Sequence, residues 1–172
     1  MTRHRHGSAV YEFPNDLEIL ATRAFDAPIG LVFDVFTKPE HVEKTFAPFD
    51  EKVTACTIDL RVGGTYHYVF VTNDGTECSF RGTYLEVEPP NRTVQTWLFE
   101  GWPNAEAVET MDLHEIDGVT TMTYRLAFRD QAGRDHMSTF DGHSASFDNA
   151  EDYLISLLEG NEAVSDGATD FN

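Results

Sequence analysis

The stretch Thr65-Tyr66-His67-Tyr68-Val69-Phe70-Val71-Thr72-Asn73-Asp74-Gly75 decides the fold of this chain. Its first seven residues read as a strand, and the period of two places Tyr66, Tyr68 and Phe70 on one face. The Asn-Asp-Gly that follows is a strong hairpin signal, and it leads into a second predicted strand over Glu77–Val87. The stretch therefore predicts an antiparallel hairpin with an aromatic face.

The same alternation continues on both sides of this hairpin. Gly63-Gly64 and Pro89-Pro90-Asn91 read as turns, and Asp117-Gly118 predicts a second tight hairpin. Further strands are predicted over Leu17–Phe25, Lys52–Ile58, Thr93–Glu100, Ala107–Ile116 and Val119–Phe128. We therefore expect an antiparallel sheet of about seven strands.

Helical spacing interrupts the strands early in the chain and follows them at its end. A short helix is predicted after Asp26-Ala27-Pro28, and a second one from Pro39 to about Thr45. A long amphipathic helix should begin near Ser138 and stop at Gly160. Its apolar face is formed by Phe140, His143, Phe147, Ala150, Leu154 and Leu157. A helix with such a face must cover the sheet, which gives an α+β fold.

Short sequence strings in this order carry a family resemblance. The strings are Phe25-Asp26-Ala27-Pro28, Pro39-Glu40-His41, Asp59-Leu60-Arg61-Val62-Gly63-Gly64, Arg81-Gly82, Glu86-Val87-Glu88-Pro89-Pro90-Asn91-Arg92, Thr96-Trp97, and Gly142 with Tyr153-Leu154. Their order and spacing resemble the START-like (SRPBCC, helix-grip) superfamily, in the branch of the heat-shock-protein ATPase activator homologues. The resemblance covers residues 17–159, which we take as the domain. Residues 1–16 are expected to be an N-terminal extension and residues 160–172 an acidic tail.

The resemblance implies a curved sheet wrapped around the long C-terminal helix, with two short helices between the first two strands of the domain. It also implies a cavity between sheet and helix that takes hydrophobic or amphipathic molecules. Two positions depart from the family pattern. Thr45-Phe46-Ala47-Pro48 stands where the family usually has Trp-Trp-Gly-Pro, and Gly142-His143 where it has Gly-Trp.

Composition narrows the choice of partner. The chain has 172 residues and a net charge of −18, from 30 acidic and 12 basic side chains. Such a surface repels a phosphate backbone and anionic lipid headgroups, so we expect neither a nucleic-acid nor a membrane partner. Half of this surplus lies between Asp135 and Asn172, where nine acids and no Lys or Arg occur. We expect these carboxylates to form the solvated back of the last helix.

A ligand site is predicted between the sheet and the C-terminal helix. Tyrosine suits a mixed-polarity wall because it combines an apolar ring with a hydroxyl. The candidate ligand-binding residues are Phe36, Phe46, Tyr66, Tyr68, Phe70, Phe80, Trp97, Phe99, Phe140, His143 and Phe147. Phe36 and Phe46 should lie near the entrance. The leading hypothesis is binding of a small hydrophobic or aromatic molecule, with His143 setting its orientation.

Two other functions stay open. A cyclase or dehydratase would use the same cavity, with His143 as general base and Tyr66 as acid. A protein-interaction module, as in chaperone-associated relatives, would have a filled interior and an exposed apolar patch. We expect binding rather than catalysis, and a homodimer or a chaperone partner is compatible with the sequence.

The remaining reactive residues give weaker signals. The spacing of the histidines fits no common metal motif, so we expect no metal and no cofactor. Cys56 and Cys78 lie on strands that another strand separates, and we expect two buried free thiols in a cytoplasmic protein. Glu77, Glu109 and Asp112 are expected on the solvated outer face of the sheet, unless one of them turns inward near Tyr66 or His143 and forms an acid–base pair.

Overall fold

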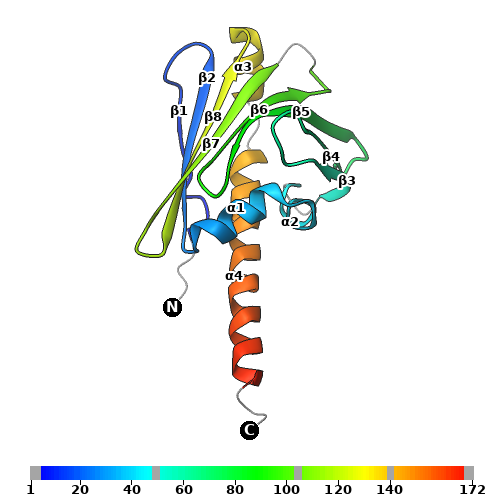
Figure 1. Cartoon of the computed structure of the whole chain (residues 1–172). Helices are drawn as coiled ribbons and strands as arrows, with labels where there is room; N and C mark the ends of the chain where they lie inside the picture. Colours follow the sequence, from blue (N-terminus) through cyan, green and yellow to red (C-terminus); the bar gives the residue numbers. More distant parts are fainter. Residues whose placement is uncertain (1–4, 48–50, 103–105, 139–141, 169–172) are drawn as a thin grey trace.

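The computed structural model describes residues 5–47, 51–102, 106–138 and 142–168, with the backbone alone for 142–144 and 161–168. These residues form an α+β structure with an eight-stranded antiparallel sheet and four helices (Figure 1). The strands are β1 (Val10–Glu12), β2 (Glu18–Phe25), β3 (Lys52–Ile58), β4 (Thr65–Val71), β5 (Glu77–Glu88), β6 (Arg92–Phe99), β7 (Ala107–Ile116) and β8 (Val119–Phe128). The helices are α1 (Ile29–Thr37), α2 (Pro39–Thr45), α3 (Gln131–Ser138) and α4 (Gly142–Ala168).

The sheet order is β1-β2-β8-β7-β6-β5-β4-β3, so β2 pairs with the last strand along the chain. Between β2 and β3 the chain crosses to the other end of the sheet through α1 and α2. The long helix α4 contacts both short helices, runs along the sheet and extends beyond it (Figure 1). This is the predicted helix-grip arrangement, and β1 raises the expected number of strands to eight.

The two predicted hairpins are confirmed. Ile116 and Val119 pair directly, and Asp117 (φ 51°) and Gly118 (φ 80°) form the two-residue turn between them. Positive φ at both central positions defines a type I′ turn, whose twist matches that of the strands. Gly75 (φ 89°) has the same role in the longer turn between β4 and β5.

The core lies between the inner face of the sheet and the helices. Strict alternation buries Ile19, Ala21, Arg23 and Phe25 on β2, and the aligned strands continue this face. The apolar face of α4 packs into the same core through Phe147, Ala150 and Leu154. Phe140 and the side chain of His143, which were predicted on this face, lie outside the described residues.

Polar contacts fix where α4 lies relative to α2. Ser146 Oγ donates to the carbonyl oxygen of Phe46 at 2.8 Å, and Asn149 Nδ2 donates to that of Ala47 at 2.8 Å. These carbonyls follow the last turn of α2, where a helix leaves its own acceptors unsatisfied. The contacts hold Phe46 against the sheet, in a position that matters for the site.

The predicted ends of the C-terminal helix are wrong. Ser138 ends the separate helix α3 instead of starting α4, and its hydroxyl donates to the Asp135 carbonyl at 2.8 Å. At the other end α4 continues past Gly160 to Ala168. A single helical glycine costs only about 1 kcal/mol relative to alanine, which is too little to stop a helix by itself. No helix in the described part of the chain is long and apolar enough to cross a bilayer.

Candidate ligand cavity

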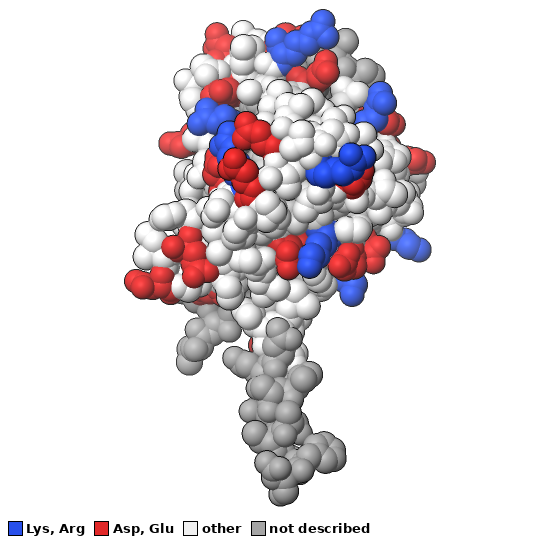
Figure 2. Space-filling view, in the orientation of Figure 1, with Lys and Arg blue, Asp and Glu red and all other residues white. Residues whose placement is uncertain are grey.

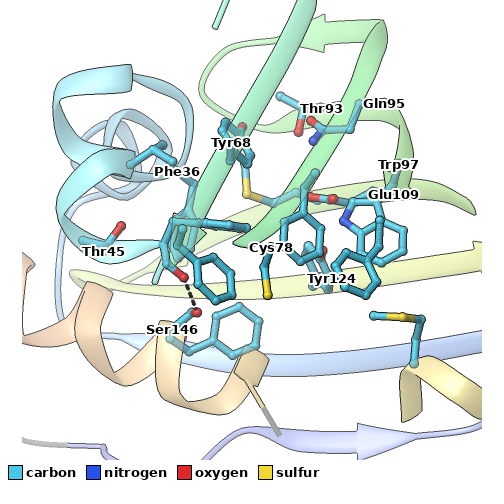
Figure 3. Close-up of a pocket in the computed structure, with 18 of the residues that line it drawn as sticks. Phe36, Thr45, Tyr68, Cys78, Thr93, Gln95, Trp97, Glu109, Tyr124 and Ser146 are labelled. Carbon is cyan, nitrogen blue, oxygen red and sulfur yellow. Dashed lines mark hydrogen bonds between the residues drawn. The ribbon is translucent and has the colours of Figure 1, made fainter. Parts of the chain in front are cut away.

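A cavity of about 320 Å³ lies between the inner face of the sheet, α2 and α4 (Figure 3). We call it the aromatic cavity, because nine of the twenty residues that line it are aromatic. The residues that line it are Phe36, Val42, Thr45, Phe46, Glu51, Tyr68, Phe70, Thr72, Cys78, Phe80, Thr93, Gln95, Trp97, Phe99, Glu109, Met111, Tyr124, Met137, Ser146 and Phe147.

Eight of the eleven predicted ligand-binding residues line this cavity: Phe36, Phe46, Tyr68, Phe70, Phe80, Trp97, Phe99 and Phe147. The structure thus brings together residues from three strands (β4, β5 and β6), two helices (α1 and α4) and Phe46 at the end of α2. That these side chains bind a ligand stays a prediction. Phe140 and the side chain of His143 lie outside the described residues, so the role of His143 also stays a prediction.

The aromatic wall is organised around Phe46, immediately after α2. Its ring centroid lies 4.9 Å from that of Tyr68 and 5.3 Å from that of Phe80. Phe80 in turn stacks on Phe99 at 4.9 Å and touches Trp97 at 5.6 Å. These tilted, edge-on and stacked pairs at 4.5–7 Å are favourable ring geometries, so the rings of the wall stabilise one another.

Tyr66 does not line the cavity, although it shares a face with Tyr68. Its hydroxyl donates to the Thr96 carbonyl at 2.7 Å, and its ring centroid lies 4.9 Å from that of Tyr68. Gly82, directly opposite on β5, leaves room for the Tyr66 ring. Tyr66 therefore supports the wall from behind, and its hydroxyl is already used by the backbone.

The position of Glu109 contradicts the prediction that Glu77, Glu109 and Asp112 all lie on the outer face of the sheet. Asp112 does lie outside, where it pairs with Arg92 at 2.9 Å, and Glu77 is exposed. Glu109 instead points into the aromatic cavity from β7 (Figure 3). Burial raises the pKa of its carboxyl to about 7, and a hydrogen bond with Tyr124 only partly offsets this.

The two strands that flank β7 provide polar groups beside Glu109. Gln95 of β6 is its direct cross-strand partner and also lines the cavity, and Tyr124 of β8 reaches it by a hydrogen bond. Burial holds the pKa of Tyr124 well above its usual value, with the nearby Glu109 charge adding to the shift. Figure 3 shows Gln95 and Glu109 together on the sheet side, across the cavity from Ser146 of α4. The site is a largely apolar chamber in which Gln95, Glu109 and Tyr124 form one polar group on the sheet side.

The inward position of Glu109 could have been found from the sequence. Ala107, Met111 and Leu113 are apolar residues of β7, and Glu109 has the same parity as all three. Their side chains are buried, whereas Val108 on the other parity is 38% exposed. Alternation along this strand therefore places the carboxylate inside. The general expectation that a carboxylate on a strand faces solvent was instead given more weight than this alternation.

The buried charges of α4 lie elsewhere in the core. Glu151, expected on the solvated back of the helix, is only 3% exposed, and it pairs with the buried Arg23 of β2 at 3.4 Å. Asp148 accepts a second bond from Arg23 at 3.0 Å. The backbone amide of Arg5 donates to Glu151 at 2.7 Å. The expectation that all acids of this helix face solvent is therefore wrong.

One group of described side chains has metal-binding geometry. The ligand atoms of His6, Glu151 and Asp152 lie within 4.8 Å of one another. His6 Nε2 is 2.7 Å from Asp152, and this hydrogen bond raises the pKa of the imidazole. His6 Nε2 also lies 3.1 Å from Glu151 Oε2, so these contacts tie the N-terminal segment to α4.

The two cysteines are free thiols on β3 and β5, and β4 lies between these strands as predicted. Both are half-buried rather than fully buried. Cys78 lines the aromatic cavity, and burial raises the pKa of its thiol. A neutral thiol adds a soft, weakly polar surface to the wall.

Solved structures share this fold. A protein from Rhodobacter sphaeroides has a TM-score of 0.78 at 17% identity, over 87% of this chain and 99% of its own. A protein from Staphylococcus epidermidis, solved by NMR, has a TM-score of 0.72 at 25% identity, over 86% of this chain and 94% of its own. DynU16, from the dynemicin biosynthetic locus, has a TM-score of 0.65 at 20% identity, over 82% of this chain and 48% of its own.

The curated proteins include no significant match to this sequence. The family model described as activator of Hsp90 ATPase homolog 1-like protein matches residues 26–154, which includes every described residue that lines the aromatic cavity. The match covers three quarters of the sequence, and the shared fold agrees with it. The chain therefore belongs to the family of activator of Hsp90 ATPase homolog 1-like proteins.

Proposed function

We propose that this protein binds a small, largely apolar molecule in the aromatic cavity. The observation that carries the proposal is the cavity itself, about 320 Å³ with walls of aromatic rings. Protein interiors are normally close-packed, with few voids larger than a water molecule. A chamber of this size falls within the range of small-molecule pockets.

The wall can supply enough binding energy for such a ligand. Burial of about 200 Å² of apolar ligand surface would gain about 5 kcal/mol before entropic costs. Contacts among Phe46, Phe80 and Phe99 already order the wall, so little further side-chain entropy would be lost. The polar group at Glu109 would then orient the ligand.

A protein-interaction module explains the interior less well. That alternative expects a filled core, and the aromatic cavity is unfilled by side chains of the described residues. A homodimer or a chaperone partner stays a separate hypothesis about the outer surface. The two free thiols favour a cytoplasmic location.

The binding proposal is tested with N-phenyl-1-naphthylamine, a neutral probe whose fluorescence rises in apolar surroundings. We expect saturable binding by the wild type and loss of binding in Thr93→Phe, which adds a ring to the buried sheet side of the cavity. Val108→Phe is the matched control, because it adds the same ring to the outer face of β7. Native mass spectrometry of the purified protein would identify any molecule that co-purifies. Equal probe binding by Thr93→Phe and Val108→Phe would place the probe elsewhere and contradict the proposal.

An acid–base enzyme is the second candidate, and Glu109 is the observation that favours it. A carboxyl with a pKa of about 7 can give and take protons at neutral pH, and it lies in a cavity beside Tyr124. It would replace Tyr66 in the role of the cavity acid, because the Tyr66 hydroxyl is bound to the backbone. The expected chemistry is proton transfer at a carbon next to a carbonyl group.

This candidate is tested with 2-tetralone in D₂O, by following α-proton exchange with NMR. An enzyme of this kind accelerates exchange in the wild type, with a rate that depends on pH near 7, and Glu109→Gln loses the acceleration. His143→Ala measures whether the histidine takes part as well. Exchange at the buffer rate in the wild type would leave binding as the function.

A further inference from the structure

The charge of the aromatic cavity allows a narrower statement about the ligand, which rests on the proposed function. Among the described lining residues there are two carboxyl groups, Glu51 and Glu109, and no Lys, Arg or His. The other titratable groups of that wall are Cys78, Tyr68 and Tyr124, and burial raises the pKa of all three. The described wall thus offers negative charge and no positive charge.

The arginines of the neighbouring strands form ion pairs with other carboxylates, and none of them pairs with Glu109. Arg92 on the outer face of β6 pairs with Asp112 at 2.9 Å, and Arg125 on the outer face of β8 pairs with Glu18 at 2.6 Å. Arg23 points inward from β2 but is held by Asp148 and Glu151 of α4. Glu109 forms no ion pair with any Lys, Arg or His of the described residues.

We propose that the ligand of the aromatic cavity is a small organic cation: an aromatic or alicyclic body with one protonated amine, which pairs with the Glu109 carboxylate. The body would pack against the aromatic wall, and the ammonium would lie beside Gln95 and Tyr124. The rings of Trp97 and Tyr124 line the same chamber and can attract a cation through their faces.

The ionisation of Glu109 fits this assignment. The groups that feel its charge from β4, β5 and β8 are the phenols of Tyr66, Tyr68, Tyr84 and Tyr124, all neutral near pH 7. Desolvation without a compensating cation is what keeps the pKa near 7, and a bound ammonium would supply that cation. The net charge of −18 adds a long-range attraction for cations.

The test compares three probes that share one ring system: 2-naphthylmethylamine, 2-naphthylmethanol and naphthalene-2-carboxylate. At pH 8 we expect the amine to bind at least about tenfold more tightly than the alcohol, the range of a charge-assisted hydrogen bond. The carboxylate should bind most weakly. Between pH 6 and pH 8 the affinity for the amine should rise about fivefold, as a carboxyl of pKa about 7 ionises while the alkyl ammonium stays charged.

Two variants assign the effect to Glu109. Glu109→Gln should weaken amine binding about tenfold at pH 8, abolish its pH dependence and leave the alcohol within about threefold. Glu88→Gln removes the same charge from an exposed position on β5, and should bind all probes as the wild type does. In His143→Ala the preference for the amine should persist.

Each other outcome is decisive. Equal binding of amine and alcohol by the wild type would overturn the cation assignment while leaving the cavity proposal in place. An affinity for the amine that falls as pH rises would also overturn it, because the protonated carboxyl, and not the carboxylate, would then be the form that binds. Loss of the preference in His143→Ala but not in Glu109→Gln would overturn the choice of residue. Failure of all three probes to bind would instead count against the proposed function.

Discussion

At the scale of a residue, Glu109 is a carboxyl whose ionisation the fold opposes. Folding raises its pKa from 4.5 to about 7, chiefly by desolvation. Between these values the folded protein binds more protons at this site than the unfolded chain does, so stability falls as pH rises. The loss is complete above pH 7 and amounts to about 3 kcal/mol.

Glu109→Gln should therefore stabilise the protein at pH 8 and bring little gain at pH 5. The amide has no charge to desolvate and can still hydrogen-bond with Tyr124, the partner of the wild-type carboxyl. The measurement is the free energy of unfolding in urea at both pH values. Glu88→Gln is the control, because that side chain is exposed. If wild type and Glu109→Gln lose the same stability between pH 5 and pH 8, the carboxyl is not desolvated as described.

At the scale of elements, the buried ion pair between β2 and α4 offers a prediction. Arg23→Met should lower the free energy of unfolding by about 3–5 kcal/mol, because it removes the buried cation that pairs with both Glu151 and Asp148. Arg81→Met is the matched control, and should cost less than about 1 kcal/mol because the Arg81–Glu100 pair is exposed. Both are measured by urea unfolding. Equal losses would mean that the Arg23 pair contributes no more than a surface pair.

The close contact between β4, β5 and β6 at Gly82 gives a second prediction at this scale. A methyl group at Gly82 would overlap the carbonyl oxygen of Thr96 and lie 2.6 Å from the ring of Tyr66. Gly82→Ala should therefore destabilise the protein by about 2–4 kcal/mol and weaken binding of N-phenyl-1-naphthylamine, since Tyr66 supports the cavity wall. Gly30→Ala in α1 is the control: its methyl group meets nothing within 4 Å, and a helical alanine should stabilise by up to about 1 kcal/mol. A loss of stability well below about 2 kcal/mol in Gly82→Ala would show that β5 can shift at this position.

Elements that depend on a few adjacent residues were predictable from the sequence. Features that depend on residues far apart along the chain were not. The tight turn at Asp117-Gly118 and the start of α2 at Pro39 follow from the conformations of a few adjacent residues. The short strand β1 forms because the edge of β2 is available, and Glu151 is buried where Arg23, the Arg5 amide and His6 lie beside it. Five of the eight predicted residues that line the cavity lie on strands, where alternation predicts the face on which each side chain lies. Glu109 was missed because its residue type was given more weight than its parity.

At the scale of the whole molecule, the net charge of −18 is the dominant feature of the surface. Figure 2 shows basic side chains next to acidic ones on one face, in agreement with outer pairs such as Arg92–Asp112. With 12 bases against 30 acids, most carboxylates have no base to pair with. Their mutual repulsion opposes the compact state, and it is strongest at low ionic strength.

Raising NaCl from about 10 mM to about 150 mM should therefore stabilise the protein at pH 8, because the Debye length falls from about 30 Å to about 8 Å. The same salt also weakens surface ion pairs, but exposed pairs such as Arg61–Asp59 contribute less than about 1 kcal/mol each. Near pH 4.5, the isoelectric point, the net repulsion vanishes and the stabilisation should vanish with it. Melting temperatures in NaCl and in KCl measure the effect, and equal shifts in the two salts separate screening from binding of one cation at the His6–Glu151–Asp152 group. A melting temperature that falls with salt at pH 8 would mean that the ion pairs outweigh the repulsion of the surplus acids.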